Sequence, residues 1–331
     1  MIEIMQDKRV SLAPMMDWTT PEFRFFARLF NRHIWLYSEM VSTSAILHGD
    51  RERLLKLDPS EHPAVLQLGG SDPAQLAQAS RFGEQAGFDE INLNVGCPSD
   101  RVQHNRIGAC LMAEPELVAE LYLAMQGAID IPVTIKHRIG IDDLQSYEDL
   151  ARFVQIVSEA GCQHFIVHAR IALLDGLSPK QNREVPPLRY DDVYRLKADF
   201  PELFIEINGG INQFEAAKEH LEHLDGVMIG RAFYHQPELM GQLCTLWGEP
   251  TPKASEVLEA LYPYLDSWQK TTSVPLAVIC RHFLGLFAGQ PGSRKWRQDL
   301  SGKKQITIDD IRAAADHVLL NEPSNVSSNG A

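Results

Sequence analysis

Eight short runs of mostly apolar residues recur along the chain, with longer amphipathic segments between them. The runs are 10–15, 36–40, 64–69, 91–96, 133–138, 165–170, 203–209 and 226–231. Most are continuously apolar, as expected of parallel strands that are covered on both faces. The intervening segments 72–88 and 146–162 open with a capping residue and close at a glycine, which predicts helices. Eight such repeats predict a (β/α)8 TIM barrel, and no GxGxxG motif follows the first run to favour a Rossmann sheet.

The pattern changes after Trp247, where a turn-rich segment, GEPTPKA, is followed by three segments with helical spacing and no strand pattern. These segments are 256–270, 276–289 and 306–320. They predict a small all-helical C-terminal domain. The last stretch is polar and low in complexity, which predicts disorder. The expected domains are a TIM barrel over 1–243, a helical domain over 252–321 and a disordered tail over 322–331.

Composition and charge narrow the class of protein. No stretch approaches the roughly 18 apolar residues of a membrane helix, and the amino terminus has no signal-peptide core, so we expect a cytoplasmic protein without a membrane partner. The five cysteines are scattered and never form a CxxC pair, which argues against disulfides and a metal site. The net charge of -13 disfavours general nucleic-acid binding, so such a partner would need a local basic face.

Chemically distinctive residues gather at the predicted carboxyl ends of the strands, where barrel enzymes have their active sites. In chain order these are Pro14, Met15, Met16, Glu39, Gln67, Asn94, Cys97, Lys136, Arg138, His168, Arg170, Asn208, Gly209, Gly210, Gly230 and Arg231. The loops after strands seven and eight contain NGG and GR, which suit the common phosphate site of barrels. We therefore expect a phosphorylated ligand; the alternative is two tight turns with a surface arginine.

Three of these side chains allow more than one role. Lys136 could form a Schiff base, hold a phosphate or stabilise an anionic ring, or it could simply reach solvent from the strand end. His168 could bind a ligand or be a satisfied core histidine. Gln67 has a donor and an acceptor for the edge of a planar heterocycle, but could equally brace a loop.

Cys97 stands between Gly96 and Pro98, so its thiol is expected at the mouth of the barrel rather than packed inside. A thiolate nucleophile would need an activating base or cation, and the sequence does not place His104 or His168 within reach. A thiol acid needs only an ordinary pKa, since the group is mostly protonated at neutral pH.

Seven segments together resemble the tRNA-dihydrouridine synthases, most closely the bacterial A type, over nearly the whole chain. They are APMMDWTT (13–20), LQLGGSDP (66–73), DEINLNVGCPSDRV (89–102), VTIKHRIGIDD (133–143), HARIALLDGLSPKQNREVPPL (168–188), INGGI (207–211) and DGVMIGR (225–231). The resemblance implies an FMN-binding barrel followed by a helical tRNA-binding domain. It also implies a monomeric enzyme that uses NADPH to reduce the C5=C6 bond of D-loop uridines 20 and 20a.

The resemblance further implies roles for individual residues. The flavin-contacting set is Pro14, Met15, Met16, Gln67, Lys136 and His168, with Asn208, Gly209, Gly210, Gly230 and Arg231 at its phosphate. The tRNA-contacting set is Asn94, at the target uridine, with Lys180, Arg183, Arg294 and Arg297. Cys97 would give a proton to C5 of uracil while the flavin gives a hydride to C6.

A basic segment, residues 281–304, offers the local positive face that tRNA needs. It has six cations, Arg281, Arg294, Lys295, Arg297, Lys303 and Lys304, against one acid, Asp299. The alternative is a solvated helix face. Other interpretations of the chain are an FMN barrel acting on a free pyrimidine such as dihydroorotate, a flavin-free barrel using Lys136 as a Schiff base, and a tRNA-folding chaperone.

Overall fold

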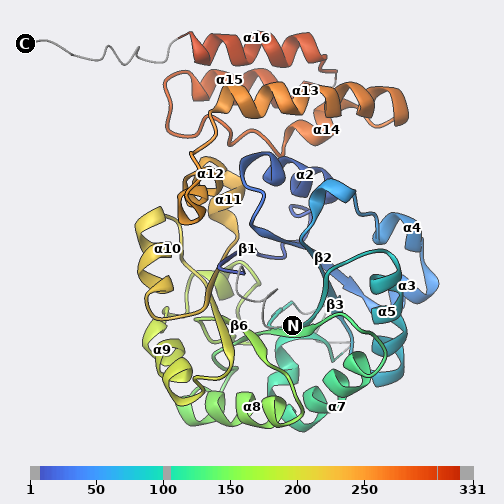
Figure 1. The fold of residues 1–331 in the computed structure, drawn as a ribbon, viewed down its shortest axis with the longest axis vertical. Coiled ribbons are helices and arrows are strands. Elements are labelled where there is room, and N and C mark those ends of the chain that lie inside the picture. The colour runs from blue at the N-terminus through green and yellow to red at the C-terminus, as the bar shows by residue number, and fades with distance from the viewer. Residues whose placement is uncertain (1–7, 100–105, 304, 321–331) are drawn as a thin grey trace, which may run out of the picture. The chain divides into compact units, whose positions relative to one another are not determined.

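The computed structural model describes residues 8–99, 106–303 and 305–320. Eight parallel strands close in sequence order into one barrel, which confirms the TIM barrel predicted from the sequence (Figure 1). The strands are β1 (Val10–Leu12), β2 (Trp35–Ser42), β3 (Ala64–Gly69), β4 (Glu90–Val95), β5 (Val133–Arg138), β6 (His164–His168), β7 (Phe204–Asn208) and β8 (Gly226–Ile229). His104, Lys304 and the predicted disordered tail, 322–331, lie outside the described residues.

Helices form a ring around the barrel (Figure 1). They are α2 (Pro21–Phe30), α3 (Thr43–His48), α4 (Arg51–Leu54), α5 (Pro73–Gln85), α7 (Pro115–Gln126), α8 (Tyr147–Glu159), α9 (Tyr190–Asp199) and α10 (Phe214–Leu221), with the short turns η1 (Pro59–Glu61), η2 (Gly108–Ala113) and η3 (Gln181–Arg183). The two helices predicted at 72–88 and 146–162 are confirmed. Ser146 and Asp149 form a capping box at the start of α8, which satisfies backbone N–H groups that the helix leaves open.

The barrel interior is partly polar, and β4 shows why. Its sequence, EINLNV, alternates strictly, so successive side chains face opposite sides of the strand. Ile91 lies against Gly83 of α5, which places the apolar set under the helices. Glu90, Asn92 and Asn94 therefore face the interior, where all three are buried.

The chain divides into two compact units. One comprises the chain up to Phe25 together with His33–Gly230, and the other comprises Phe26–Arg32 and the chain from Arg231 onward. The elements of the second unit after Gly230 are α11 (Arg231–His235), α12 (Glu238–Gln242), η4 (Leu243–Trp247), α13 (Ala254–Thr271), α14 (Leu276–Cys280), α15 (Ser293–Leu300) and α16 (Ile308–Leu319). None of the helices in the described ranges is both long and apolar enough to cross a membrane.

The helix predicted at 276–289 is confirmed only for 276–280, because α14 ends at Cys280, and is wrong for 281–289. The following residues form tight turns, such as the hydrogen bond from the N–H of His282 to the carbonyl of Ile279. At Gly285 the backbone lies so close to His235 that a Cβ would come within 2.6 Å of its carbonyl oxygen. The apolar residues after Cys280 therefore pack from a series of turns and not from a helix.

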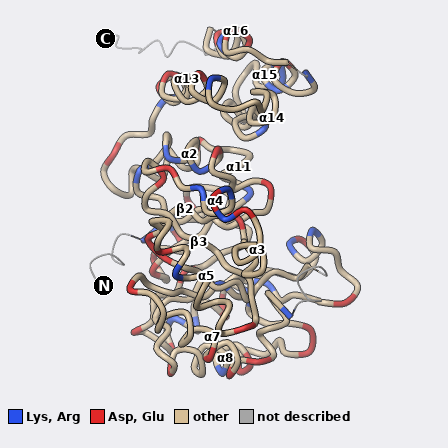
Figure 2. The backbone as a smooth tube through the Cα atoms, turned by 90° about the vertical axis from the view of Figure 1, so that its right-hand side faces the viewer, with Lys and Arg blue, Asp and Glu red and all other residues tan. Residues whose placement is uncertain are grey.

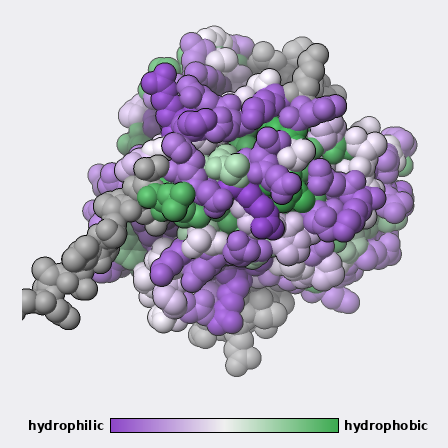
Figure 3. Space-filling view, turned by 90° about the horizontal axis from the view of Figure 1, so that it is seen from above, coloured by the Kyte–Doolittle hydropathy of each residue, from purple (hydrophilic) through white to green (hydrophobic). Residues whose placement is uncertain are grey.

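α15 is held by one aromatic side chain and exposes its cations. Trp296 is fully buried, packs edge-on against Phe287 at 5.1 Å between ring centroids, and donates to the carbonyl of Phe283 at 3.3 Å. Arg294 and Arg297 are exposed on the same helix, within the basic segment. Figure 2 marks Lys and Arg positions of α15 in blue. The surface seen from the side of α16 is mainly hydrophilic, with small hydrophobic areas (Figure 3).

Candidate active site at the barrel mouth

The pairing of the strands places the predicted mouth residues in two rows, two residues apart, at one end of the barrel. Asn94 pairs with Lys136, Arg138 pairs with His168, and His168 pairs with Asn208. Residues far apart in the sequence therefore become neighbours at the carboxyl ends of β4 to β7.

Lys136 is buried and has a neutral hydrogen-bond partner. Its Nζ donates to Oδ1 of Asn208 at 3.0 Å, and Nδ2 of Asn208 donates to the carbonyl of Met228 at 2.8 Å. Burial, with the nearby Arg138 cation, lowers the pKa of Lys136 to about 7, although Glu206 acts in the opposite direction. An anionic ligand near this lysine would favour its charged form.

Two glycines follow β7 with backbone angles that side chains rarely adopt. Gly209 has φ +116° and Gly210 has φ +76°. A Cβ at Gly209 would lie 2.7 Å from Cδ2 of His168, and one at Gly210 would lie 2.5 Å from Leu188. Only glycine fits here, and the bare backbone suits close approach of a phosphate.

The turn after β1 lies beside the turn after β8. Met15 is fixed by Thr19, whose N–H donates to the carbonyl of Met15 at 2.9 Å. A Cβ on Gly230 would lie 3.2 Å from Sδ of Met15. Pro14 is half-buried and Met16 is 58% exposed, so side chains of this turn are accessible from outside the barrel.

Cys97 follows β4 in a turn that Asn94 holds. The backbone N–H of Cys97 donates to Oδ1 of Asn94 at 2.9 Å. Burial raises the pKa of the Cys97 thiol, and the cations Arg138, Arg183 and Lys136 only partly oppose this effect. The raised pKa favours the protonated thiol at neutral pH, which is the form that a proton donor needs.

Arg138 is a residue to which the sequence alone assigned no role. Its Nε donates to the carbonyl of Gly96 at 2.9 Å, and its Nη1 donates to the carbonyls of Ile171 and Asn182 at 3.0 Å each. Burial lowers its pKa to about 10, so it stays charged. Arg138 thus ties the Cys97 turn to the loop after β6.

Asn182 organises that loop and was not predicted from the sequence. Its Oδ1 accepts the N–H of Leu173 at 2.8 Å, and its Nδ2 donates to the carbonyls of Leu173 and Leu177 at 2.8 and 3.1 Å. It is fully buried, whereas Lys180 and Arg183 on either side are exposed. A buried amide thereby fixes a turn that displays two cations.

The remaining predicted residues belong to the helical unit. Arg231 starts α11 directly after Gly230 and is exposed. Arg294 and Arg297 are exposed on α15, where Lys295 pairs with Asp299 at 2.8 Å. Within the described ranges no group of three His, Cys, Asp or Glu side chains is arranged to hold a metal ion.

The fold and the mouth define a β/α barrel that gathers a cysteine, a buried lysine and bare glycine backbone at the carboxyl ends of its strands. The family model for dihydrouridine synthase matches residues 11–318, so the chain belongs to this family of flavin-dependent oxidoreductases. It is 56% identical over 88% of both chains to the tRNA-dihydrouridine(20/20a) synthase of Synechocystis. It is also 55% identical, over 92% of both chains, to the enzyme of that name from Pseudomonas aeruginosa.

Proposed function

We propose that this protein reduces uridines 20 and 20a in the D-loop of tRNA to 5,6-dihydrouridine, with FMN bound and NADPH as the electron donor. The two relatives described above, which are 56% and 55% identical to it over 88% and 92% of the chain, have the corresponding name. The observation that carries the proposal is the position of Cys97 directly after β4, where its backbone N–H donates to Oδ1 of Asn94 at 2.9 Å and burial raises the pKa of its thiol. A tRNA substrate implies a cytoplasmic enzyme, and we propose that it acts as a monomer.

The residues at the mouth fit a flavin mononucleotide. Gly209 and Gly210 leave bare backbone where side chains would collide. The ammonium group of Lys136 donates to a neutral amide, that of Asn208, so an anionic ligand would supply the opposite charge. The proposed flavin-binding set is Pro14, Met15, Met16, Gln67, Lys136, His168, Asn208, Gly209, Gly210, Gly230 and Arg231. When bound, the flavin supplies the hydride that C6 of uracil receives.

Cys97 supplies the proton in this proposal. The C5=C6 bond of uracil is conjugated with the C4 carbonyl, so addition of hydride to C6 places negative charge on C5 and O4. The S–H bond of Cys97 breaks, its proton goes to C5, and the thiolate later regains a proton from solvent. Lys136, Arg138 and Arg183 stabilise that thiolate, since each lowers the pKa of Cys97.

Binding of tRNA is proposed for both parts of the chain. The target base must leave its stack to reach a barrel mouth, and RNA of this kind is recognised by shape and phosphate contacts. Asn94 would contact the uracil, and Lys180 and Arg183 the surrounding RNA. Arg294 and Arg297 would bind phosphates from the helical domain, 252–321, while the barrel domain, 1–243, performs the reaction.

Mapping of dihydrouridine, nucleotide by nucleotide, tests this function. Unmodified tRNA is incubated with the purified protein, FMN and NADPH, with Cys97→Ala as the control for the acid. We expect reduction confined to positions 20 and 20a. Reduction at other positions would overturn the specificity, and turnover of orotate with no change in tRNA would establish the free-pyrimidine alternative.

A further inference from the structure

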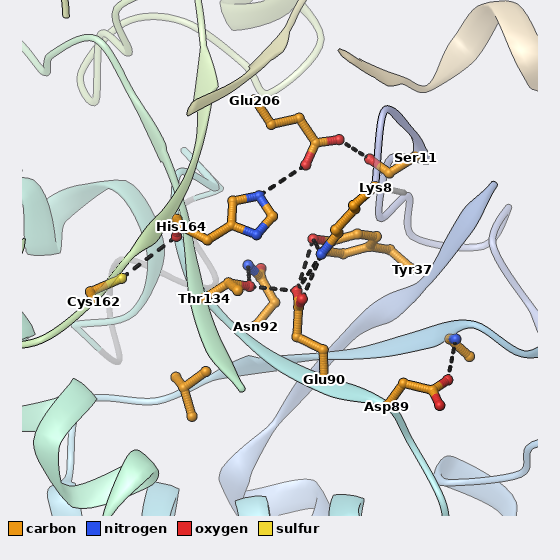
Figure 4. Close-up of polar contacts among 12 residues, drawn as sticks. Lys8, Ser11, Tyr37, Asp89, Glu90, Asn92, Thr134, Cys162, His164 and Glu206 are labelled. Carbon is orange, nitrogen blue, oxygen red and sulfur yellow. Dashed lines mark hydrogen bonds and ion pairs between the residues drawn. The ribbon is translucent and has the colours of Figure 1, made fainter. Parts of the chain in front are cut away.

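A chain of buried side-chain hydrogen bonds starts at the amino end of β4. The carboxylate of Glu90 accepts from Nζ of Lys8 at 2.6 Å and from the hydroxyl of Tyr37 at 3.1 Å. It also accepts from the hydroxyl of Thr134 at 2.7 Å (Figure 4). Oγ1 of Thr134 in turn accepts from Nδ2 of Asn92 at 2.9 Å. The chain thus passes from β4 to β5 and back.

The same chain continues to the turn that contains Cys97. Oδ1 of Asn92 accepts from Nε2 of Gln67 at 2.8 Å, and Oε1 of Gln67 accepts from Nδ2 of Asn94 at 2.8 Å. Oδ1 of Asn94 accepts from the backbone N–H groups of Gly96 and Cys97 at 3.1 and 2.9 Å. An unbroken path therefore runs the length of β4, about 13 Å at the usual rise of a strand.

Every donor in this chain points toward Glu90, and each end fixes that direction independently. Backbone N–H groups can only donate, so Asn94 must turn its oxygen to them and its nitrogen to Gln67. The same argument then fixes Gln67 and Asn92, and obliges the hydroxyl of Thr134 to give its proton to Glu90. That carboxylate can only accept, so the two ends agree.

We propose that Asn92 and Thr134 are positioning residues for the Cys97 turn. They hold the amide of Gln67 in one orientation, and Gln67 holds Asn94, which grips the backbone at Cys97. Thr134, Asn92 and Gln67 are at most 2% exposed, so water cannot readily replace a lost link. Hydrogen bonds aligned in one direction in a low-dielectric interior also strengthen one another.

Two variants break the chain of hydrogen bonds at different positions, and two further variants serve as controls. Thr134→Val keeps the shape of the side chain but removes its hydroxyl, and Asn92→Ala removes the next amide. Thr134→Ser restores the hydroxyl and should rescue the chain. Tyr37→Phe removes a hydroxyl from the same Glu90 carboxylate, but leaves the path to Asn94 complete.

Each variant is compared with the wild type by three measurements of the Cys97 turn and of the reaction. Hydrogen exchange by mass spectrometry reports the amides of Gly96 and Cys97, alkylation by iodoacetamide reports the Cys97 thiol, and steady-state kinetics give kcat and KM for tRNA. Thermal unfolding shows that each variant is folded. We expect Thr134→Val and Asn92→Ala to speed exchange and lower kcat by about tenfold with an unchanged KM, whereas Thr134→Ser and Tyr37→Phe match the wild type.

The kinetic part of this expectation rests on the proposed function, but the exchange part does not. Exchange in Thr134→Val no faster than in Tyr37→Phe would overturn the positioning role. Faster exchange with normal kcat would also overturn it, because the turn would then move without consequence for the reaction. A wild-type protein that makes no dihydrouridine would instead refute the proposed function, while exchange still tests the hydrogen-bond chain.

Discussion

Lys136 and Asn208 lie on strands that are not neighbours, yet the ammonium of one donates to the amide oxygen of the other at 3.0 Å across the position of β6. Because Nδ2 of Asn208 donates to the carbonyl of Met228, its oxygen is fixed toward the lysine. A neutral amide offsets only part of the cost of burying a cation. The lowered pKa of Lys136, about 7, is the result.

Binding of FMN should therefore be coupled to proton uptake by Lys136. An anionic ligand raises the pKa of this lysine from about 7, so the apoprotein takes up protons on binding between pH 7 and 8. Calorimetric titrations of FMN in buffers of different ionisation enthalpy measure the number of protons taken up per FMN bound. In Lys136→Met the uptake should disappear and the affinity should fall at least about tenfold. Lys180→Met, at an exposed position, should leave both unchanged.

The same lysine should make stability depend on pH. Its pKa is about 7 in the folded protein, below the ordinary value of 10.5 in the unfolded chain. Between these values the unfolded state binds more protons, so the contribution of Lys136 to stability rises with pH. The free energy of unfolding of wild type minus that of Lys136→Met should increase from pH 7 to 9 by up to about 2 kcal/mol. A flat difference in urea titrations would contradict the lowered pKa.

Cys97→Ala should fold, bind flavin and accept electrons from NADPH, but form product at least about 100-fold more slowly. Single-turnover reduction of tRNA by the prereduced enzyme measures this step. Because burial raises the thiol pKa, product formation should stay constant through neutral pH and fall only above the ordinary pKa of 9.0. Cys110 is a second half-buried cysteine, and the control variant Cys110→Ala should form product at the wild-type rate. A rate that rises with pH would identify a thiolate nucleophile instead.

Arg138→Lys should destabilise the protein although it keeps the charge. Lysine cannot reach the carbonyls of Gly96, Ile171 and Asn182 together, so buried and half-buried acceptors lose their donor. We expect a loss of about 2–3 kcal/mol in the free energy of unfolding, with faster proteolysis of the 171–184 loop. Arg152→Lys, in an exposed ion pair with Glu116, should change stability by less than about 0.5 kcal/mol.

The barrel could be predicted because its signal is local. Each strand and each capped helix can be recognised from about ten consecutive residues. Eight strand–helix repeats then predict that the sheet closes into a barrel. Once β4 is recognised as a strand, the strict alternation in EINLNV also places Glu90, Asn92 and Asn94 on one face. The prediction of a helix over 281–289 is wrong because Gly285 lies against the backbone of His235, a contact that no local pattern shows.

Only part of the candidate site could be predicted from the sequence, because the rest depends on contacts between distant segments. Residue types at strand ends pointed to Cys97 and Lys136, since those positions converge in every barrel. The links of Arg138 to three carbonyls depend on loop conformations that form after the barrel closes. The amide orientation of Gln67 likewise depends on the pairing of β3 with β4, which places Asn92 beside it.

Arg294→Glu combined with Arg297→Glu should weaken tRNA binding and its dependence on salt. Both side chains are exposed on α15, while the buried Trp296 that anchors the helix stays in place. If each arginine neutralises one phosphate, the slope of log affinity against log salt should fall by about 2. Arg152→Glu with Arg195→Glu changes the net charge equally at exposed barrel positions and should leave the slope unaltered. Equal losses in the two double variants would show that overall charge, and not the basic segment, governs binding.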